Sequence, residues 1–506
     1  MAGSGVFTCG DAHAIPLKNP RFVTDWEPYH LKETTLHEVE ARLAREPEVI
    51  TLQFERARLL AQLGRSRQAM HAYADILLKR PNDFASLINL GAVLTDLAQY
   101  QDALKLYREV VQRFPDNPAG HLNLACVLSV LGETTEARAG YETVLRLDPD
   151  HSDAHHWLSD LLMESGEEDA SFAHRRAATA KQPWRTSPFR GKKEPVFIML
   201  LGSARGGNAP IQRYLGEKDF FTSVTYTDFY TPSLPLPRHQ VVINLIGDAD
   251  RSADSLQTAD LLLERTSAPV LNPPARVRPT GRDDNARRLG KLEGVITPRI
   301  LTLPREVLIN ADASSVLKQH DFAFPILLRA PGFHGGAHFS KVENPGELAS
   351  AASQLPGKEL TVIQFLETRD ADGKIRKYRV MLIDGKLYPL HKAISDHWKV
   401  HYFSAQMADN PEHRAEELAF LEDMPGVLGP RAMQALEQIR DTLALDYAGV
   451  DFSLNAQGEV LLFEANATMM AALPEGGAKW DYRRPAAKRI HDAVREMIRS
   501  RAGVAA

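Results

Sequence analysis

The 506 residues are enough for two to four domains, and 44% hydrophobic with 25% charged residues is the composition of an ordinary globular protein. A net charge of -5 gives no general reason to expect nucleic-acid binding. Two cysteines far apart exclude a disulfide framework or a cysteine metal cluster, and they suit a reducing compartment, so we expect a cytoplasmic protein.

The amino terminus, MAGSGVFTCGDAHAIPL, has neither a basic start nor a long apolar run, so no signal peptide is expected. No stretch of the chain reaches 18 uninterrupted apolar residues, and we therefore expect no membrane span. Residues 1–35 are assigned to an N-terminal extension.

Residues 36–185 carry markers that recur every 34 residues, and small residues stand at the same step where two helices must turn. This pattern resembles tetratricopeptide repeats, with two helices in each unit, and predicts an all-α solenoid. Three full repeats cover about residues 49–150, and residues 36–45 are either the second helix of a degenerate first repeat or a cap. A fourth repeat, to about residue 183, has Arg175 where the tyrosine is expected. The recurring markers are Pro81, Pro115, Pro149 and Pro183; Ala69, Ala103 and Ala137; Tyr73, Tyr107 and Tyr141; and Gly64, Ala98, Gly132 and Gly166.

A repeat array of this kind does no chemistry by itself, and its stacked units form a surface that usually holds a peptide or protein. Polar side chains of the first helices are candidate contacts, with local packing or solvation as the alternative for each. They are Asn89, His121, Asn123 and His155.

The segment QPWRTSPFRGKKE, residues 182–194, is rich in proline and basic residues and is interpreted as a linker. A solvated connector is the favoured interpretation, and contact with a partner is the alternative. The apolar runs VFIMLL (196–201) and QVVINLI (240–246) then predict buried strands of a small parallel α/β domain, assigned to residues 186–305.

A strand that ends in a cation and runs into a glycine-rich loop is predicted in FPILLRAPGFHGGAH, residues 324–338. The cation is Arg329, and the loop contains Gly335 and Gly336. Glycines let backbone N–H groups approach a phosphate closely, so this loop is a candidate anion site. An ordinary glycine-rich hairpin is the alternative.

The stretch YAGVDFSLNAQGEVLLFEAN, residues 447–466, predicts two strands joined by a turn at residues 455–458. If the turn is symmetric, Asp451 lies opposite Leu462 and shares a face with Glu464 and Asn466. The other face is apolar and can be buried. Three oxygen ligands suit a hard cation such as Mg²⁺, whereas a hairpin with a polar outer face is the alternative.

Asp451 in GVDFSL, followed by Glu464 and Asn466 in LLFEAN, resembles the metal-binding end of the ATP-grasp superfamily. That superfamily includes D-alanine–D-alanine ligase, glutathione synthetase and ribosomal-protein glutamate ligases. The resemblance extends more weakly from about residue 196. It implies that the three residues hold one or two Mg²⁺ ions, or Mn²⁺, between the phosphates of ATP.

The same resemblance assigns other residues to nucleotide binding. Arg282 opens a predicted helix where the family usually has a phosphate-binding lysine, with Arg287 and Arg288 as alternatives. Arg329 stands where the family usually has lysine at the strand before the glycine loop. The strand LTVIQFLE leads to the adenine hinge. The implied binding residues are Arg282, Arg329, Gly335, Gly336, Gln364, Phe365, Leu366 and, for the ribose hydroxyls, Glu367. A later acid such as Asp370 is the alternative for the ribose.

Two further cations are implied as catalytic by the resemblance. Arg379 in KYRV matches the arginine of a family pattern in which Lys377 stands where aspartate is usual. Lys392, after LYPLH, occupies a position often held by an arginine that contacts phosphate or substrate.

The expected architecture is therefore multidomain: a tetratricopeptide solenoid, a small α/β domain and an α+β ATP-grasp domain at residues 306–506. The expected function is an ATP- and Mg²⁺-dependent carboxylate–amine ligase that works through an acyl phosphate. Its partners would be a small-molecule acid and amine, and a peptide or protein docked by the repeats, with no nucleic acid and no membrane. A non-catalytic scaffold with a degenerate, ATP-sensing module is the alternative.

Overall fold

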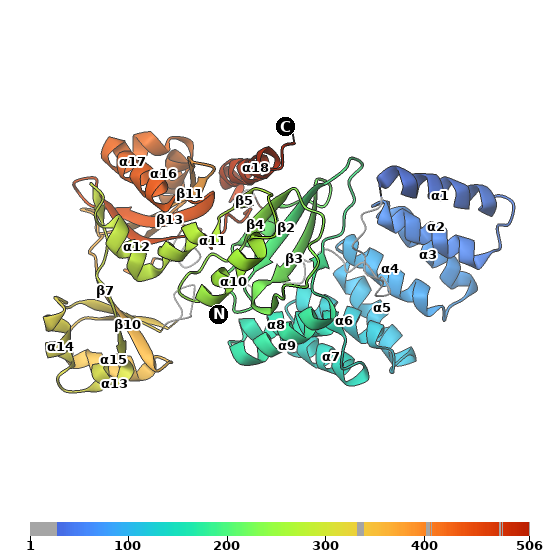
Figure 1. Ribbon diagram of the computed structural model, residues 1–506, viewed down its shortest axis with the longest axis horizontal. Coiled ribbons are helices and arrows are strands. Elements are labelled where there is room, and N and C mark those ends of the chain that lie inside the picture. Colours follow the sequence, from blue (N-terminus) through green and yellow to red (C-terminus); the bar gives the residue numbers. More distant parts are fainter. Residues whose placement is uncertain are drawn as a thin grey trace. The chain divides into compact units, whose positions relative to one another are not determined.

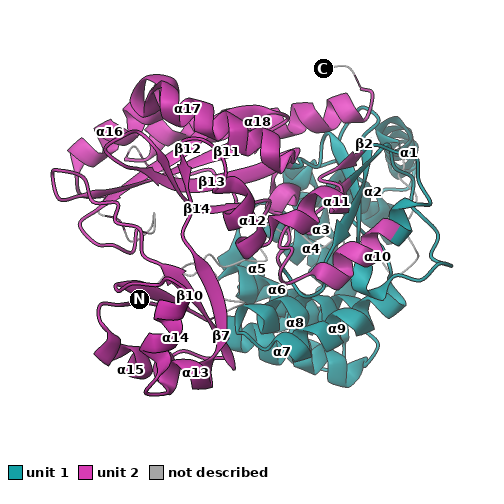
Figure 2. Ribbon diagram, turned by 60° about the vertical axis from the view of Figure 1, so that its left-hand side comes forward, with its two compact units in different colours: residues 1–206, 215–242, 261–269 teal, residues 207–214, 243–260, 270–506 magenta. Residues whose placement is uncertain are grey.

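The computed structural model describes residues 28–330, 338–400, 405, 407–474, 477 and 479–504. These residues form two compact units, coloured separately in Figure 2. Unit 1 contains residues 1–206, 215–242 and 261–269, and unit 2 contains residues 207–214, 243–260 and 270–506. The four domains expected from the sequence stay predictions.

Unit 1 begins with an all-helical array in which helices follow one another in pairs (Figure 1). A single helix, α1, precedes four pairs, and its buried Leu36 and Val39 pack with residues of the first pair. The bounds are α1 Tyr29–Leu43, α2 Ile50–Gln62, α3 Ser66–Lys79, α4 Phe84–Asp96, α5 Tyr100–Arg113, α6 Pro118–Val130, α7 Thr134–Leu147, α8 Ser152–Glu164 and α9 Glu168–Lys181.

The 34-residue period corresponds to specific structural positions in each pair. The periodic alanines and tyrosines are buried, and the four small residues at the turns all have positive φ, including Ala98 at 58°. At the equivalent position in α2, α6 and α8, a polar side chain donates a hydrogen bond to the carbonyl of the proline six residues before it. The pairs are Gln53 with Pro47 at 2.5 Å, His121 with Pro115 at 2.7 Å and His155 with Pro149 at 2.9 Å.

Local hydrogen bonds also satisfy the other first-helix residues that were considered as partner contacts. The side-chain amides of Asn89 and Asn123 each donate to the carbonyl four residues earlier, at 2.7 Å. The four candidate contacts, Asn89, His121, Asn123 and His155, therefore all bond within their own repeats and stabilise them. Cys126 is buried in the array, where the Tyr141 hydroxyl lies 3.4 Å from its sulfur.

Unit 1 also contains strands that follow the array. Strand β3 (Phe220–Tyr226) lies between β1 (Arg185–Thr186) and β2 (Val196–Gly202), antiparallel to β1 and parallel to β2. Every residue of β2 is buried, which explains its continuous apolar sequence. The chain leaves unit 1 for unit 2 within β4 (Val241–Asn244) and returns to unit 1 within α10 (Ala253–Leu263).

In unit 2, the four-stranded sheet has the order β7-β10-β8-β9. One face, with Ile326, Leu328 and Val362, is packed in a core with residues of the short helices α13 to α15. The bounds are β5 Val270–Leu271, α11 Pro274–Val277, α12 Arg282–Leu289, β6 Val295–Ile296, β7 Ile300–Pro304, α13 Arg305–Ile309, α14 Ala313–Gln319, β8 Ile326–Arg329, β9 Phe339–Val342, α15 Leu348–Gln354 and β10 Glu359–Gln364.

The second sheet of unit 2 has five strands in the order β12-β11-β13-β14-β6. Its remaining elements are β11 Ile375–Ile383, β12 Lys386–Ser395, α16 Pro411–Glu422, α17 Met424–Leu443, β13 Tyr447–Leu454, β14 Val460–Asn466 and α18 Arg484–Arg501. Helix α17 is interrupted at Gly429, which has a φ of 78° and precedes Pro430. Short 3-10 helices occur at Pro210–Tyr214, Thr227–Phe229, Arg278–Thr280, Pro345–Glu347 and Asp481–Arg483.

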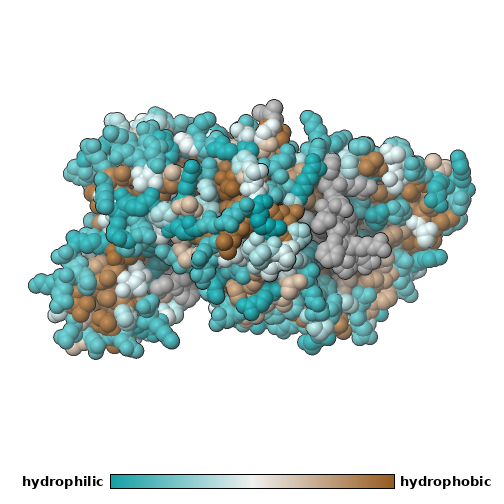
Figure 3. Space-filling model, viewed as in Figure 1, coloured by the Kyte–Doolittle hydropathy of each residue, from teal (hydrophilic) through white to brown (hydrophobic). Residues whose placement is uncertain are grey.

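Polar side chains predominate on the face drawn in Figure 3, with apolar side chains in separate groups between them. No helix among the described residues is long and apolar enough to cross a membrane.

Candidate functional site

The strand pair β13 and β14 brings two carboxylates directly opposite each other. Asp451 pairs with Glu464, whereas Phe452 pairs with Leu462, because the register shifts between Asp451 and Phe452. The expectation that Asp451 lies opposite Leu462 is therefore wrong. The conclusion drawn from it still holds, because directly opposed residues share a face and Asn466 lies two positions beyond Glu464.

The Asp451 carboxylate is buried, with 1% of its side chain exposed, and is paired with two cations from β11. Arg379 donates from Nε to Oδ1 at 2.5 Å and from Nη2 to Oδ2 at 2.7 Å. The Lys377 Nζ lies 2.6 Å from Oδ2. Burial by itself would raise the pKa of Asp451, but the charges of Arg379 and Lys377 outweigh it and hold that pKa far below its usual range.

Glu464 and Asn466 have partners of their own. The Arg282 guanidinium, at the first residue of α12, donates from Nη2 to Glu464 Oε1 at 3.0 Å, and 34% of the Glu464 side chain is exposed. Asn466 Oδ1 accepts from the backbone N–H of Thr468 at 3.0 Å and from its hydroxyl at 2.9 Å.

Of the three arginines considered in α12, Arg282 is the one paired with Glu464. Arg287 pairs with Asp283 and Asp284, and Arg288 donates to backbone carbonyls.

Arg329 ends β8 and lies within electrostatic range of this group. Burial has the largest effect and lowers the pKa of Arg329, and the charge of Arg282 lowers that pKa further. The negative charges of Glu464 and Asp248 act in the opposite direction and raise it. The register places Arg329 opposite Phe339 and Leu327 opposite Lys341, so Arg329 and Lys341 share the sheet face that does not form the helix-packed core. Gly335 and Gly336, predicted to hold phosphate, lie outside the described residues.

The predicted adenine hinge follows the same sheet. Gln364 ends β10, and its backbone N–H and side-chain oxygen both bond to the backbone of Arg299, at 2.9 and 3.2 Å. Leu366 is half-buried, and the exposed Glu367 accepts two backbone N–H groups of the turn that follows it. The Lys341 Nζ lies 4.1 Å from the centroid of the Phe365 ring. Sequence reasoning missed this cation, although its position on the strand after the glycine loop was a usable signal.

Lys392 is not brought together with Arg379, contrary to expectation. It pairs with Tyr378 across β11 and β12, and therefore lies on the opposite face of the sheet from Arg379. There its Nζ bonds Glu416 of α16 at 2.7 Å, and only 6% of its side chain is exposed. Hydrogen bonds, first from Arg376 and then from Lys392, lower the pKa of Glu416 to about 2 despite its partial burial. The residue that does lie opposite Arg379 is His391.

The three predicted metal ligands do not fit a divalent cation on their own. Both oxygens of Asp451 and one of Glu464 are paired with cations, and the Asn466 oxygen accepts two hydrogen bonds. No group of three His, Cys, Asp or Glu side chains in the described part of the chain could hold a metal ion. Arg282, Lys377 and Arg379 are paired with the two carboxylates, and Arg329 lies within electrostatic range of Glu464. This excess of positive charge is better suited to an anion.

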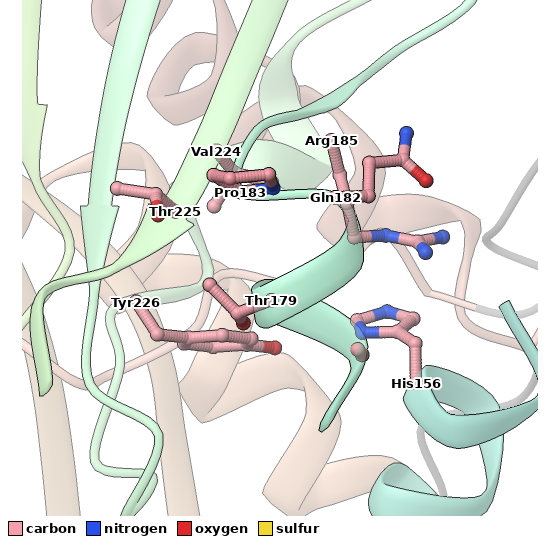
Figure 4. A pocket seen from close by; sticks show the side chains of 9 residues that line it. His156, Thr179, Gln182, Pro183, Arg185, Val224, Thr225 and Tyr226 are labelled. Atoms are coloured by element: carbon pink, nitrogen blue, oxygen red, sulfur yellow. The ribbon is translucent and has the colours of Figure 1, made fainter. Parts of the chain in front are cut away.

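Unit 1 contains a small pocket between the last helix pair and β3 (Figure 4). Its lining includes His156, Arg185 and Tyr226. The His156 Nε2 lies 3.6 Å from Asp160 Oδ2, while its buried Nδ1 has no hydrogen-bond partner among the described residues. Arg175 replaces the periodic tyrosine here: it donates to Asp160 at 2.9 Å and to the Ala204 carbonyl at 2.6 Å, and its guanidinium lies over the Tyr226 ring.

A family model described as tetratricopeptide repeat matches residues 54–118 and 122–183. The matched residues cover α2 to α9 almost completely, with the same pairing that the 34-residue period predicts. The N-terminal region consists of tetratricopeptide repeats. No curated protein matches the chain.

Solved structures similar to this chain include other repeat proteins. MamA from Desulfovibrio magneticus RS-1 is 20% identical, with 30% of this chain and 85% of that chain covered and a TM-score of 0.27. TTC0263, a tetratricopeptide protein of Thermus thermophilus, is 20% identical, with 30% and 84% covered and a TM-score of 0.28. YrrB, described as having an unusual peptide-binding site, is 18% identical, with 30% and 79% covered and a TM-score of 0.26.

The last tetratricopeptide repeat gives a prediction on pH. Burial, followed by the charge of Arg185, lowers the pKa of His156 to about 4, and Asp160 opposes the shift. Between pH 6.5 and 4 the unfolded chain therefore binds a proton that the folded chain does not, so stability falls as pH falls through this window. Between about pH 7 and about pH 4, the free energy of unfolding should fall by about 3 kcal/mol more in wild type than in His156→Gln. Urea titrations at both pH values measure it, and equal losses in the two proteins would contradict it.

Proposed function

We propose that the protein is an ATP-dependent carboxylate–amine ligase of the ATP-grasp type, which activates a carboxylate as an acyl phosphate and releases ADP and phosphate. The observation that carries the proposal is the cationic group around Asp451 and Glu464, with its members supplied by α12, β8 and β11. A polyphosphate is the ligand whose charge such a group would neutralise.

In this proposal the cationic side chains around Asp451 and Glu464 bind and orient the phosphates of ATP. Arg379 is held by two hydrogen bonds to a buried carboxylate, so its orientation is fixed before a ligand arrives. Arg282 and Arg329 neutralise charge that is spread over the transferring phosphoryl group. A Mg²⁺ ion that enters with the nucleotide would meet the carboxylate of Glu464, the more exposed of the two acids. Lys392, on the opposite sheet face, is left out of the proposed site.

The repeats supply the second part of the proposal. Tetratricopeptide repeats indicate docking of a protein or peptide, and such a partner would carry or deliver the acid or the amine. We likewise propose the cytoplasm as the compartment.

Product analysis tests the reaction. Wild-type protein, incubated with Mg·ATP and pooled candidate acids and amines, is expected to release ADP and phosphate. Arg329→Ala should lower the rate by about 100-fold, because the lost guanidinium stabilises charge in the transition state. Arg287→Ala is the matched control, since this exposed arginine pairs with acids of its own helix. AMP as the product would contradict the acyl-phosphate course, and equal rates in the two variants would remove Arg329 from the site.

A non-catalytic scaffold that senses ATP is the second candidate, and the ion pair between Lys377 and Asp451 favours it. This pair neutralises a carboxylate that the resemblance assigns to metal binding. Tight nucleotide binding by calorimetry together with no product in any mixture would favour the scaffold.

A further inference from the structure

The segment after the repeats runs back along the first helices of the array. We call residues 183–192 the strap. The Arg185 Nη1 donates to Asp153 of α8 at 2.8 Å, and its guanidinium lies over the Trp157 ring. Arg190 donates to Asp96 at the end of α4, at 2.9 Å. The Lys192 Nζ lies 5.7 Å from the Tyr29 ring centroid of α1. The strap thus spans the array from its fourth repeat to its first helix, and it is not the solvated connector that the sequence favoured.

The strap has the bonding pattern of a bound extended peptide. Its backbone pairs with β3 through β1, and the Ser187 N–H continues this ladder by donating to the Thr222 carbonyl at 3.0 Å. Its arginine side chains meanwhile reach the helices. Addition of an extended segment to a sheet edge, with side chains read by a neighbouring surface, is a recurring mode of peptide recognition.

The helix surface under the strap supplies carboxylates that match its cations. We call Tyr29, Asp96, Asp153 and Trp157 the first-helix face. The Asp96 side chain is 8% exposed, so the ion pair with Arg190 compensates the cost of burying its charge. Burial alone would raise the pKa of Asp153, but the charge and hydrogen bond of Arg185 lower it below its usual range. The two arginines that satisfy these acids are five residues apart in the sequence.

We propose that the strap is a built-in ligand of the first-helix face, and that a protein partner docks there by exchange, presenting an extended segment with two arginines five residues apart. This inference goes beyond the ligase proposal and does not depend on it. A tethered segment competes at an effective concentration of about millimolar, so the intact protein binds such a segment weakly until the strap is released.

A labelled peptide with the sequence of residues 184–193, WRTSPFRGKK, is the probe, and its binding to the full-length chain is measured by fluorescence anisotropy. The variant with Arg185→Ala and Arg190→Ala has a weakened strap and keeps both acids, so it should bind the peptide about tenfold more tightly than wild type. Arg190→Ala alone is the milder variant and should bind about threefold more tightly. The same peptide with glutamate at both arginine positions should not bind.

The matched control removes the acids instead of the arginines. The variant with Asp96→Ala and Asp153→Ala should also release the strap, seen as faster amide hydrogen exchange at residues 185–190, but should not gain peptide binding. Equal peptide binding by the two double variants would overturn the proposal, as would failure of the arginine variants to bind the peptide more tightly than wild type. Unchanged hydrogen exchange in both double variants would overturn it too, because the ion pairs would then not hold the strap.

Discussion

Replacing Asp451 by asparagine is expected to destabilise unit 2 by about 3–5 kcal/mol in the absence of nucleotide and metal. The buried carboxylate is the common partner of Arg379 and Lys377, so its loss leaves two cations close together without the acid that both contact. Urea unfolding followed by a probe within unit 2 measures the change. A carboxylate whose only task were to bind a metal would give the opposite result, because its removal would relieve charge in the metal-free protein.

Glu464→Gln is the matched control for this prediction. Its side chain is about one-third exposed and its partner Arg282 is similarly exposed, so the pair contributes little to stability. We expect the variant to unfold within about 1 kcal/mol of wild type. If Asp451→Asn were as stable as Glu464→Gln, the ion pairs of β11 would not be what holds Asp451 in place.

The repeats could be predicted closely because each of their markers has a local cause. Turn residues need positive φ, the tyrosines fill the space between helices, and the prolines end each unit, so one period reports all three. A single element with a strong pattern was also predicted well, since the run VFIMLL lies in β2. The strap could not be predicted, because its ion pairs join residues up to 94 positions apart.

In the candidate site, two β-bulges explain which predictions succeeded. In β11 and β12, a regular register continued from the turn would set Lys392 opposite Lys377, on the face of Arg379. The shift between Arg379 and Val380 moves Lys392 to the other face and places His391 opposite Arg379 instead. A one-residue shift reverses the face of every later side chain, and no local feature of the sequence reveals it.

The conclusion drawn at Asp451 holds because two one-residue shifts compensate each other there. At the turn Leu454 pairs with Val460 instead of Glu459, which is a shift of one residue from the expected register, and the bulge adds a second. The two shifts together make Glu464 the partner of Asp451 instead of Leu462 and keep the two acids on one face. The pairing of Asp451 with Lys377 also lies beyond sequence pattern. It depends on β11 lying next to β13, a neighbour that the hairpin turn does not specify.

Lys377 therefore decides what the acidic face can bind, and changing its charge should change the metal affinity. Lys377→Asp removes a cation 2.6 Å from Asp451 and places another carboxylate in the same position on β11. Because a neighbouring unit charge at this range is worth several kcal/mol even in a polar protein environment, we expect Mn²⁺ to bind the nucleotide-free variant at least about tenfold more tightly than wild type. The electron paramagnetic resonance signal of free Mn²⁺ measures the affinity directly and does not require activity.

Lys377→Met separates the two contributions to this prediction. It removes the ammonium group without adding a ligand, so its Mn²⁺ affinity should lie between those of wild type and Lys377→Asp. Arg379 still pairs with Asp451 in both variants, which limits the gain and keeps the carboxylate in its position. Equal Mn²⁺ affinity in all three proteins would mean that the lysine does not control access of cations to Asp451, and that a metal ion, where it binds, does so through Glu464 alone.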